Sequence, residues 1–193
     1  MKNALHVESV IESLLSPETD LEKQLIHHPE FKKGLQWGKP RYGHPEGKVI
    51  YHIAEVFSNI EKLTITPDTR QQLRLITLLH DTFKHLEDKS TPRDWTRHHA
   101  IIARQFAEKF ISDTQVLNII ELHDEAYYSW RLEHMFKQTQ EGRNRMSDLL
   151  FKIKDYKQLY YLFFKCDTQT GDKNQTPVMW FEQTVKGIEI VSF

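Results

Sequence analysis

The sequence predicts an all-α fold, and three observations support this prediction. Apolar residues recur three and four positions apart through most of the chain, which is the spacing of one helix face. No segment shows the sustained alternation of apolar and polar residues that a half-buried strand requires. Ser16-Pro17, Thr66-Pro67 and Thr91-Pro92 each place a capping hydroxyl directly before a proline, which is typical of a helix start. At 193 residues the chain is long enough for one domain with a hydrophobic core, so we expect a single domain over 1–193.

The first half of the chain is predicted to hold four helices. An apolar stripe predicts a helix over 4–15, and Ser16-Pro17-Glu18 predicts the start of a second, so that the N-terminal helices cover about 4–33. Residues 34–47 contain several glycines and two prolines, and we expect an ordered loop there. The next apolar stripe predicts a helix over 48–63, after which Thr66-Pro67-Asp68 caps a helix that runs to about Leu86.

The second half continues the helical pattern. After a polar loop over 87–93, Thr91-Pro92 is predicted to restart a helix, and Ser112-Asp113 to cap the one after it. Gly142 is expected to interrupt the pattern. A strongly helical stretch then runs from Met146 to about Phe164, and a last helix is expected over 177–188.

Composition limits the classes of function. The formal net charge of -1, with acids and bases interspersed, shows no strong signal for nucleic-acid binding. No long apolar segment is present, so we expect no membrane span. Cys166 is the only cysteine and the N-terminus lacks a secretory signal, which together predict a cytoplasmic protein. The apolar segment 178–181 leaves oligomerisation open.

One stretch carries the strongest functional signal. The apolar run 75–79 continues directly into His80, Asp81, Thr82, Phe83 and Lys84, so an imidazole and a carboxylate come at the end of a buried helical segment. An unpaired, ionised aspartate in an apolar site costs several kcal/mol, and such groups are therefore paired or bound to a metal. A metal ion is the expected partner.

Other polar residues share the apolar faces of predicted helices. Apolar neighbours three and four positions away place His52, His99, His123 and Asp167 on inward faces. A single inward histidine is usually a hydrogen-bonded core residue. Together with His80 and Asp81, however, these residues make a set that favours one shared site. Imidazole and carboxylate ligands suit Zn, Fe, Mn or Ni, and an aspartate can bridge two cations.

The order of these residues resembles the H…HD…D signature of the HD-domain superfamily of metal-dependent phosphohydrolases. The segment 78–84, Leu-Leu-His-Asp-Thr-Phe-Lys, is similar to the "LLHDxxK" core of that superfamily. His99 and His123 match the H…HD…H…H…D variant, whose members hold two metals bridged by the HD aspartate. The resemblance covers about 42–171, the HD core, and implies a helical bundle with one buried metal site. His98 is the alternative to His99, because Arg104 stands where the family often has alanine.

The resemblance implies hydrolysis of a small phosphomonoester or nucleotide by a metal-activated water. One or two divalent metal ions, not distinguished among Fe, Mn, Ni, Zn and Mg, would be held by His52, His80, Asp81, His99, His123 and Asp167. Asp81 would also orient the nucleophile. Lys84, one turn on, would bind substrate phosphate, although a solvated lysine at a helix end is an equally good interpretation. His44 and Tyr42 are candidate substrate-binding residues on the preceding loop, with Arg41, Glu46 and Asp124 as further candidates.

Two other functions stay open at this point. The same ligand order resembles the mixed-valent di-iron oxygenases that act on inositol and on phosphonates. In the phosphonate enzyme a histidine follows the HD aspartate by three positions, where this chain has Lys84, and this difference favours hydrolysis. The third interpretation is a non-catalytic module in which the metal only ties helices together. Six candidate ligands exceed the four that a closed structural site needs, which favours a site with open positions.

Overall fold

The computed structural model describes residues 2–192 of the chain, and the side chains of residues 8–192. Within these residues the fold is all-α, as predicted, and an isolated antiparallel bridge between Arg41 and His44 is its only β-type pairing. The α-helices are α1 (Lys2–Leu15), α2 (Asp20–His27), α3 (Pro29–Leu35), α4 (Val49–Ile60), α5 (Pro67–Leu79), α6 (His99–Ala107), α7 (Thr114–Leu122), α8 (Glu125–Trp130), α9 (Thr139–Lys152), α10 (Lys157–Thr168) and α11 (Thr176–Thr184). Two short 3-10 helices, η1 (Lys84–Leu86) and η2 (Trp95–Arg97), and one π-helical turn, η3 (Arg131–Met135), complete the set.

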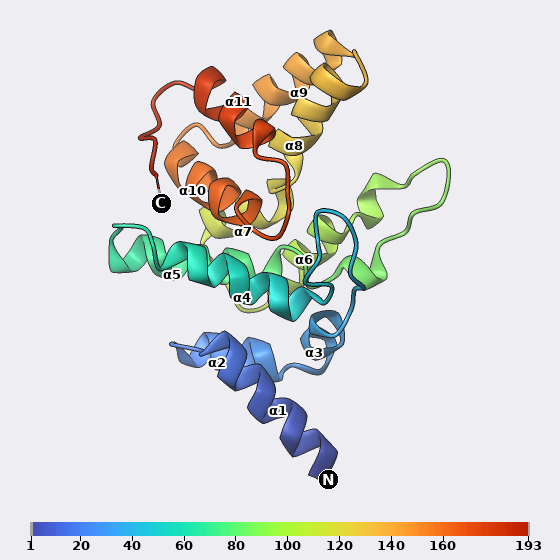
Figure 1. Cartoon of the computed structure of the whole chain (residues 1–193), viewed down its shortest axis with the longest axis vertical. Coiled ribbons are helices and arrows are strands. Elements are labelled where there is room, and N and C mark those ends of the chain that lie inside the picture. The colour runs from blue at the N-terminus through green and yellow to red at the C-terminus, as the bar shows by residue number, and fades with distance from the viewer. Residues whose placement is uncertain (1, 193) are drawn as a thin grey trace.

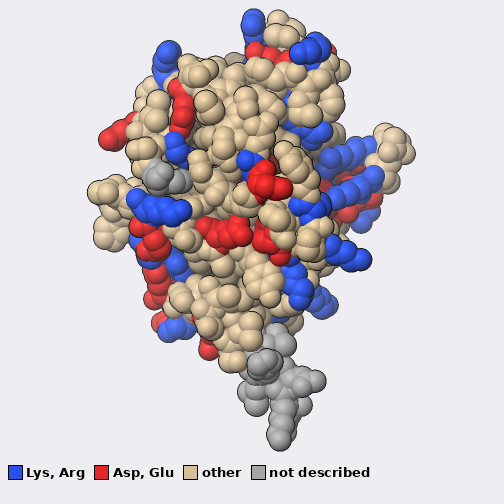
Figure 2. All heavy atoms as spheres, in the orientation of Figure 1, with Lys and Arg blue, Asp and Glu red and all other residues tan. Residues whose placement is uncertain are grey.

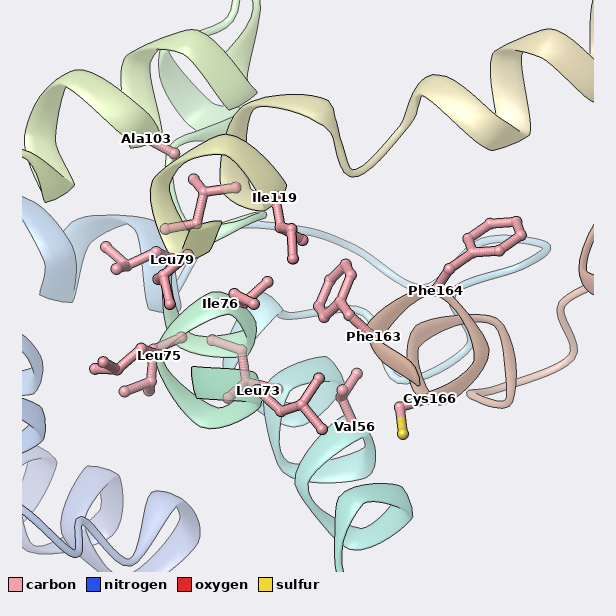
Figure 3. Close-up of a cluster of buried hydrophobic side chains, with 14 of the residues drawn as sticks. Val56, Leu73, Leu75, Ile76, Leu79, Ala103, Ile119, Phe163, Phe164 and Cys166 are labelled. Carbon is pink, nitrogen blue, oxygen red and sulfur yellow. The ribbon is translucent and has the colours of Figure 1, made fainter. Parts of the chain in front are cut away.

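Helix α5 lies at the centre of the fold. It contacts α4, α7 and α10, while α1 and α2 lie below α4 and α5 at the bottom of Figure 1. Ile76 and Leu79 of α5 are fully buried, and Figure 3 shows them among Ile119 of α7 and Phe163 of α10. One connected cluster of buried apolar residues continues from α1 to the end of α11. Packing of α5 against α4, α7 and α10 therefore fixes the position of the segment that follows it, which carries His80 and Asp81.

Helix α5 ends at Leu79, so the prediction that it runs to Leu86 was wrong. The backbone of His80 still donates to Ile76, but the chain turns directly afterwards. The Thr82 hydroxyl donates to the carbonyl of Leu78 and so takes the acceptor that the next helical amide would use. His80 and Asp81 consequently lie in a turn between α5 and η1, with His80 Nε2 3.5 Å from Asp81 Oδ2.

Two helix starts differ from prediction because other side chains supply the caps. The N-cap of α2 is Thr19 and not Ser16, since the Thr19 hydroxyl accepts from the Glu22 amide. Pro92 does not restart a helix; α6 begins at His99, with the His98 ring accepting from the Ala100 amide. The N-terminal helical region also contains a separate helix, α3, that extends to Leu35.

Gly142 does not break a helix as predicted but lies inside α9. A Cβ atom at this position would lie 2.8 Å from the carbonyl oxygen of Ser129, so the glycine permits close contact between α8 and α9. The predicted helix 146–164 is instead interrupted between α9 and α10, at residues 153–156. The last helix, α11, is shorter than the expected 177–188 and ends at Thr184.

The surface and the helix lengths agree with the compositional analysis. Figure 2 shows basic and acidic side chains interspersed over one face of the molecule. None of the helices within residues 2–192 combines the length and apolarity that a membrane crossing needs.

Candidate metal centre

Asp81 lies at the centre of a buried cluster of histidines and carboxylates. Its side chain is 5% exposed, and its two oxygens face different groups of residues. Oδ2 faces His52 and His80, at 3.9 and 3.5 Å from their Nε2 atoms. Oδ1 faces His99 and His123, at 3.4 and 3.5 Å from their Nε2 atoms. The carboxylate thus joins two half-sites, which we call the first and the second cluster.

The first cluster consists of His52, His80, Asp81 Oδ2 and Asp167. His52 on α4 places Nε2 2.8 Å from Asp167 Oδ1 on α10 and 3.3 Å from His80 Nε2. His80 Nε2 lies 3.7 Å from the same Asp167 oxygen. Helices α4 and α10 and the turn after α5 therefore each contribute to one group of four inward-facing ligand atoms.

The second cluster consists of His99, His123, Asp81 Oδ1 and Asp124. His99, the first residue of α6, and His123, directly after α7, place their Nε2 atoms 3.3 Å apart. Asp124 Oδ2 lies 3.5 Å from each of these nitrogens. This half-site also offers four ligand atoms.

Distances within both clusters fit a bound cation. Four ligand atoms about 2.1 Å from a tetrahedral metal lie roughly 3.4 Å from one another. Separations of 3.3 to 3.9 Å among His52, His80 and Asp81 Oδ2, and of 3.3 to 3.5 Å among His99, His123 and Asp81 Oδ1, lie around this value. Asp81 Oδ1 is buried and accepts no hydrogen bond, an unsatisfied state that a cation would relieve. The residues therefore fit the metal ions that the sequence predicts.

The outer nitrogens of the histidines are held by neighbouring oxygen atoms. His80 Nδ1 and His123 Nδ1 lie 2.9 and 2.8 Å from the carbonyl oxygens of Thr77 and Ile120. Such partners fix the ring orientation and tautomer, so that Nε2 stays available as a ligand.

Carboxylates lie next to the outer nitrogens of the other two rings, those of His52 and His99. Glu46 Oε1 lies 3.4 Å from His52 Nδ1, and Glu87 Oε2 lies 3.5 Å from His99 Nδ1. Burial raises the pKa of Glu46, but hydrogen bonds from His52 and His44 outweigh it and lower the pKa to about 2. An oxygen atom therefore lies behind each of the four candidate histidine ligands, although His99 Nδ1 makes no hydrogen bond to the carboxylate 3.5 Å away.

The three ligand carboxylates are ionised at neutral pH. Burial alone would raise the pKa of Asp81, but the charges of Lys84 and His80 hold it well below its usual range. Burial opposes ionisation of Asp167 too, and Lys173 and His52 outweigh it to keep that pKa well below its usual range. For Asp124, the neighbouring His123 and His99 overcome the effect of burial and lower the pKa to about 2. Ionised oxygens are the form that binds divalent cations.

Two lysines neutralise the carboxylates of the first cluster. Lys84 Nζ lies 2.5 Å from Asp81 Oδ2, and Lys173 Nζ lies 3.0 Å from Asp167 Oδ1. Burial disfavours the Lys84 ammonium, but the charges of Asp81 and Asp124 outweigh this and raise its pKa. Lys84 is thus a partly buried residue of the site, 17% exposed, and not a solvated lysine at a helix end.

A cavity of about 550 Å³ opens beside the cluster. Its polar lining residues include Asp81, His123, Asp124, Asp167, Lys84 and Lys173. Its apolar lining residues are Tyr127, Trp130, Met135, Phe164 and Pro177. This combination suits a small ligand that has both an anionic group and an apolar part.

The structure brings all six predicted ligands together and places the other candidates around them. His99, and not His98, faces Asp81; His98 lies 3.0 Å from the Tyr128 hydroxyl. Tyr42 and His44 both line the cavity, Tyr42 at an exposed position of its rim. Arg41 lines a separate small pocket on the His52 side.

Three residues of the site were not predicted in the roles that the structure indicates. Asp124 follows His123 directly, so a second His-Asp pair was present in the sequence as a signal that it could be a ligand. Glu87 and Lys173 belong to loops, and no periodicity or motif indicated that they reach the cluster. Their positions depend on contacts with distant parts of the chain.

Comparison with known families agrees with this geometry. The family model described as HD domain matches residues 49–154, which is more than half of the chain. The chain belongs to the HD-domain family. No curated protein and no solved structure matches it. HD domains belong to a superfamily of metal-dependent phosphohydrolases, and the buried histidine and aspartate clusters are consistent with a metal site of the HD type.

The family match does not reach the last ligand of the site. It covers His52, His80, Asp81, His99 and His123 but ends before Asp167. Only the tertiary structure places Asp167, through α10, at 2.8 Å from His52 in the same HD cluster.

Proposed function

We propose that this HD-domain protein is a metal-dependent phosphohydrolase that acts on a small phosphomonoester or nucleotide. The observation that carries the proposal is the bridging position of Asp81, whose two oxygens face two separate histidine pairs. Divalent cations held by the two clusters would polarise a phosphoryl oxygen and lower the pKa of an attacking water.

The protein's own residues would bind and orient the substrate. Lys84 is close enough to Asp81 to contact a phosphoryl group placed at the cluster, and its ammonium would neutralise negative charge as the transition state forms. The apolar lining residues of the cavity would hold the leaving group, with the rings of Tyr127 and Trp130, whose centroids are 6.2 Å apart, offering flat faces for contact. The cavity volume of about 550 Å³ suits a ligand of nucleotide size.

Lys84 also supports hydrolysis over the oxygenase alternative. In phosphonate-cleaving oxygenases, which share the ligand order, a histidine occupies the position three after the HD aspartate. An ammonium cannot serve as a metal ligand, and it binds phosphate readily. A purely structural metal site would leave the adjoining cavity without a role.

The test combines metal analysis with two activity assays. Protein purified without chelator is analysed for metal, and then assayed for phosphate release from a panel of phosphomonoesters and nucleotides, with and without oxygen. We expect about two equivalents of divalent metal and phosphate release that does not depend on oxygen. Asp81→Asn is expected to lose both metal and activity, and Asp148→Asn, a change at an exposed aspartate, to keep both. Oxygen consumption coupled to substrate loss would instead establish the oxygenase.

A further inference from the structure

A second lysine, Lys173, enters the site from the loop between α10 and α11. Its Nζ donates to Oδ1 and to the carbonyl oxygen of Asp167, each at 3.0 Å. The side chain is 17% exposed and lines the same cavity as Lys84. Two ammonium groups from segments far apart in the sequence thus line one cavity.

The loop that carries Lys173 is braced on several sides. Gln175 Nε2 donates to the carbonyl oxygens of Lys173 and Thr168, at 2.9 and 2.8 Å. Asp172 Oδ1 accepts from the amide of Gly43 at 2.6 Å, which ties the loop to the opposite rim of the cavity. These contacts fix the backbone of the Lys173 loop, so ligand binding costs little conformational entropy there.

Lys173 and a divalent cation would compete for the same oxygen. Asp167 Oδ1, which accepts from Lys173, also lies 2.8 Å from His52 Nε2 in the first cluster. Lys84 occupies Asp81 Oδ2 of the same cluster in the same way. Cations there would neutralise the carboxylates, while the Asp167 carbonyl oxygen still retains Lys173 at the cavity. Two ammonium groups beside neutralised carboxylates favour an anionic ligand.

We propose that Lys173 is a second phosphate-binding residue, which grips the phosphoryl group of the substrate together with Lys84. The inference rests on the phosphohydrolase function proposed above. Lys173 lies beyond residues 49–154, so this contact comes from the C-terminal part of the chain and not from the segment that matches the family.

Binding of inorganic phosphate to the metal-loaded protein tests this role. Isothermal titration is carried out on the parent, Lys173→Gln, Lys173→Arg and Lys186→Gln, the last as a control at an exposed lysine. Loss of one charge-assisted hydrogen bond is expected to raise the phosphate Kd of Lys173→Gln by about tenfold. Lys173→Arg is expected to stay within about threefold of the parent, since the charge remains.

Metal affinity, measured by titration without phosphate, distinguishes phosphate binding from support of Asp167. If Lys173 binds phosphate, Lys173→Gln binds metal at least as tightly as the parent, because a competing ammonium is gone. Unchanged phosphate affinity in Lys173→Gln would overturn the inference, as would a parallel loss of metal affinity, which would mark Lys173 as a positioning residue for Asp167. If the loaded parent itself fails to bind phosphate, the phosphohydrolase proposal falls, and the inference with it.

Discussion

Gly34 of α3 lies directly against the backbone of Thr82, in the turn that carries His80 and Asp81. A Cβ atom on Gly34 would lie 1.7 Å from the Thr82 carbonyl oxygen, far inside contact distance. Helix α3 therefore packs tightly against the turn that carries the bridging aspartate, Asp81. Glycine is required because the neighbour is backbone and cannot move aside as a flexible side chain could.

Gly34→Ala is expected to destabilise the protein and to weaken metal binding. The added methyl group must displace the turn after α5, and overpacking of this kind costs about 1–3 kcal/mol or more. Chemical denaturation and metal titration measure the two effects. Lys33→Ala, at the exposed neighbouring position in α3, is the control and should match the parent. A Gly34→Ala protein with parental stability and metal affinity would contradict the close packing.

The two clusters are expected to lose metal independently. His52→Ala removes a ligand only from the first cluster, and His123→Ala only from the second, so each should reduce about two metal equivalents to about one. Asp81→Asn, which alters both clusters, should bind the least metal. Elemental analysis and titration give the stoichiometry, with His27→Ala as a control at a histidine that pairs with Glu12 on the surface. Complete metal loss from either single histidine variant would show that one cluster cannot fill without the other.

Stability of the N-terminal region depends on a buried ion pair between Glu22 and Arg74. Arg74 donates to both Glu22 oxygens, at 2.8 and 3.0 Å, and both residues are at least 97% buried from solvent, at 0% and 3% exposure. Glu22→Ala leaves the buried guanidinium with only the more exposed Glu18 carboxylate, 3.3 Å from Arg74 Nη1, as an ionic partner, and is expected to cost up to about 3–5 kcal/mol. Urea denaturation measures the loss, and Gln71→Ala, on the exposed face of the same helix α5, is the control.

The same pair permits a second comparison. Glu22→Leu combined with Arg74→Met removes both charges and should destabilise less than Glu22→Ala alone. Equal or greater destabilisation by the double change would mean that the carbonyl oxygens of Leu15 and Ser16, which also accept from Arg74, dominate its contribution.

The alkylation rate of the Cys166 thiol is expected to measure local unfolding of α10. The thiol is fully buried, and burial raises its pKa to about 12. A raised pKa keeps the folded protein in the thiol form, so native alkylation by iodoacetamide at pH 8.5 should be at least about a hundredfold slower than in guanidinium chloride. Stability should fall as pH rises above about 9, because the unfolded thiol then ionises first.

Metal should slow the native reaction of Cys166 further, since the neighbouring Asp167 belongs to the first cluster. Rates are compared between pH 7.5 and 10 with and without metal. A fast native reaction that titrates near pH 9 would show that the α10 segment is open to solvent.

Patterns among residues close together in the sequence predicted most residues of the candidate site. His52, His99, His123 and Asp167 are predictable as inward-facing because apolar residues three and four positions away set the buried face of each helix. His80 and Asp81 are predictable because they directly continue a buried apolar run. The cap at Thr66 and the cap at Asp113 were likewise predicted correctly, since a capping side chain acts on amides only two or three residues away.

Contacts between distant segments decided the rest. Sequence alone predicts a helix break at Gly142, whereas the structure shows that the glycine allows close packing against Ser129 of α8. The end of α5 depends on the Thr82 hydroxyl, which donates to a carbonyl oxygen of the helix. Glu87 and Lys173 reach the cluster from loops whose course is set by packing. The sequence by itself determined the helical class and most of the inward-facing histidines and aspartates, because both follow from patterns over a few residues. Only the tertiary structure decided how the ligands divide between the two oxygens of Asp81 and which lysines stand beside them, because those distances join helices and loops that lie far apart along the chain.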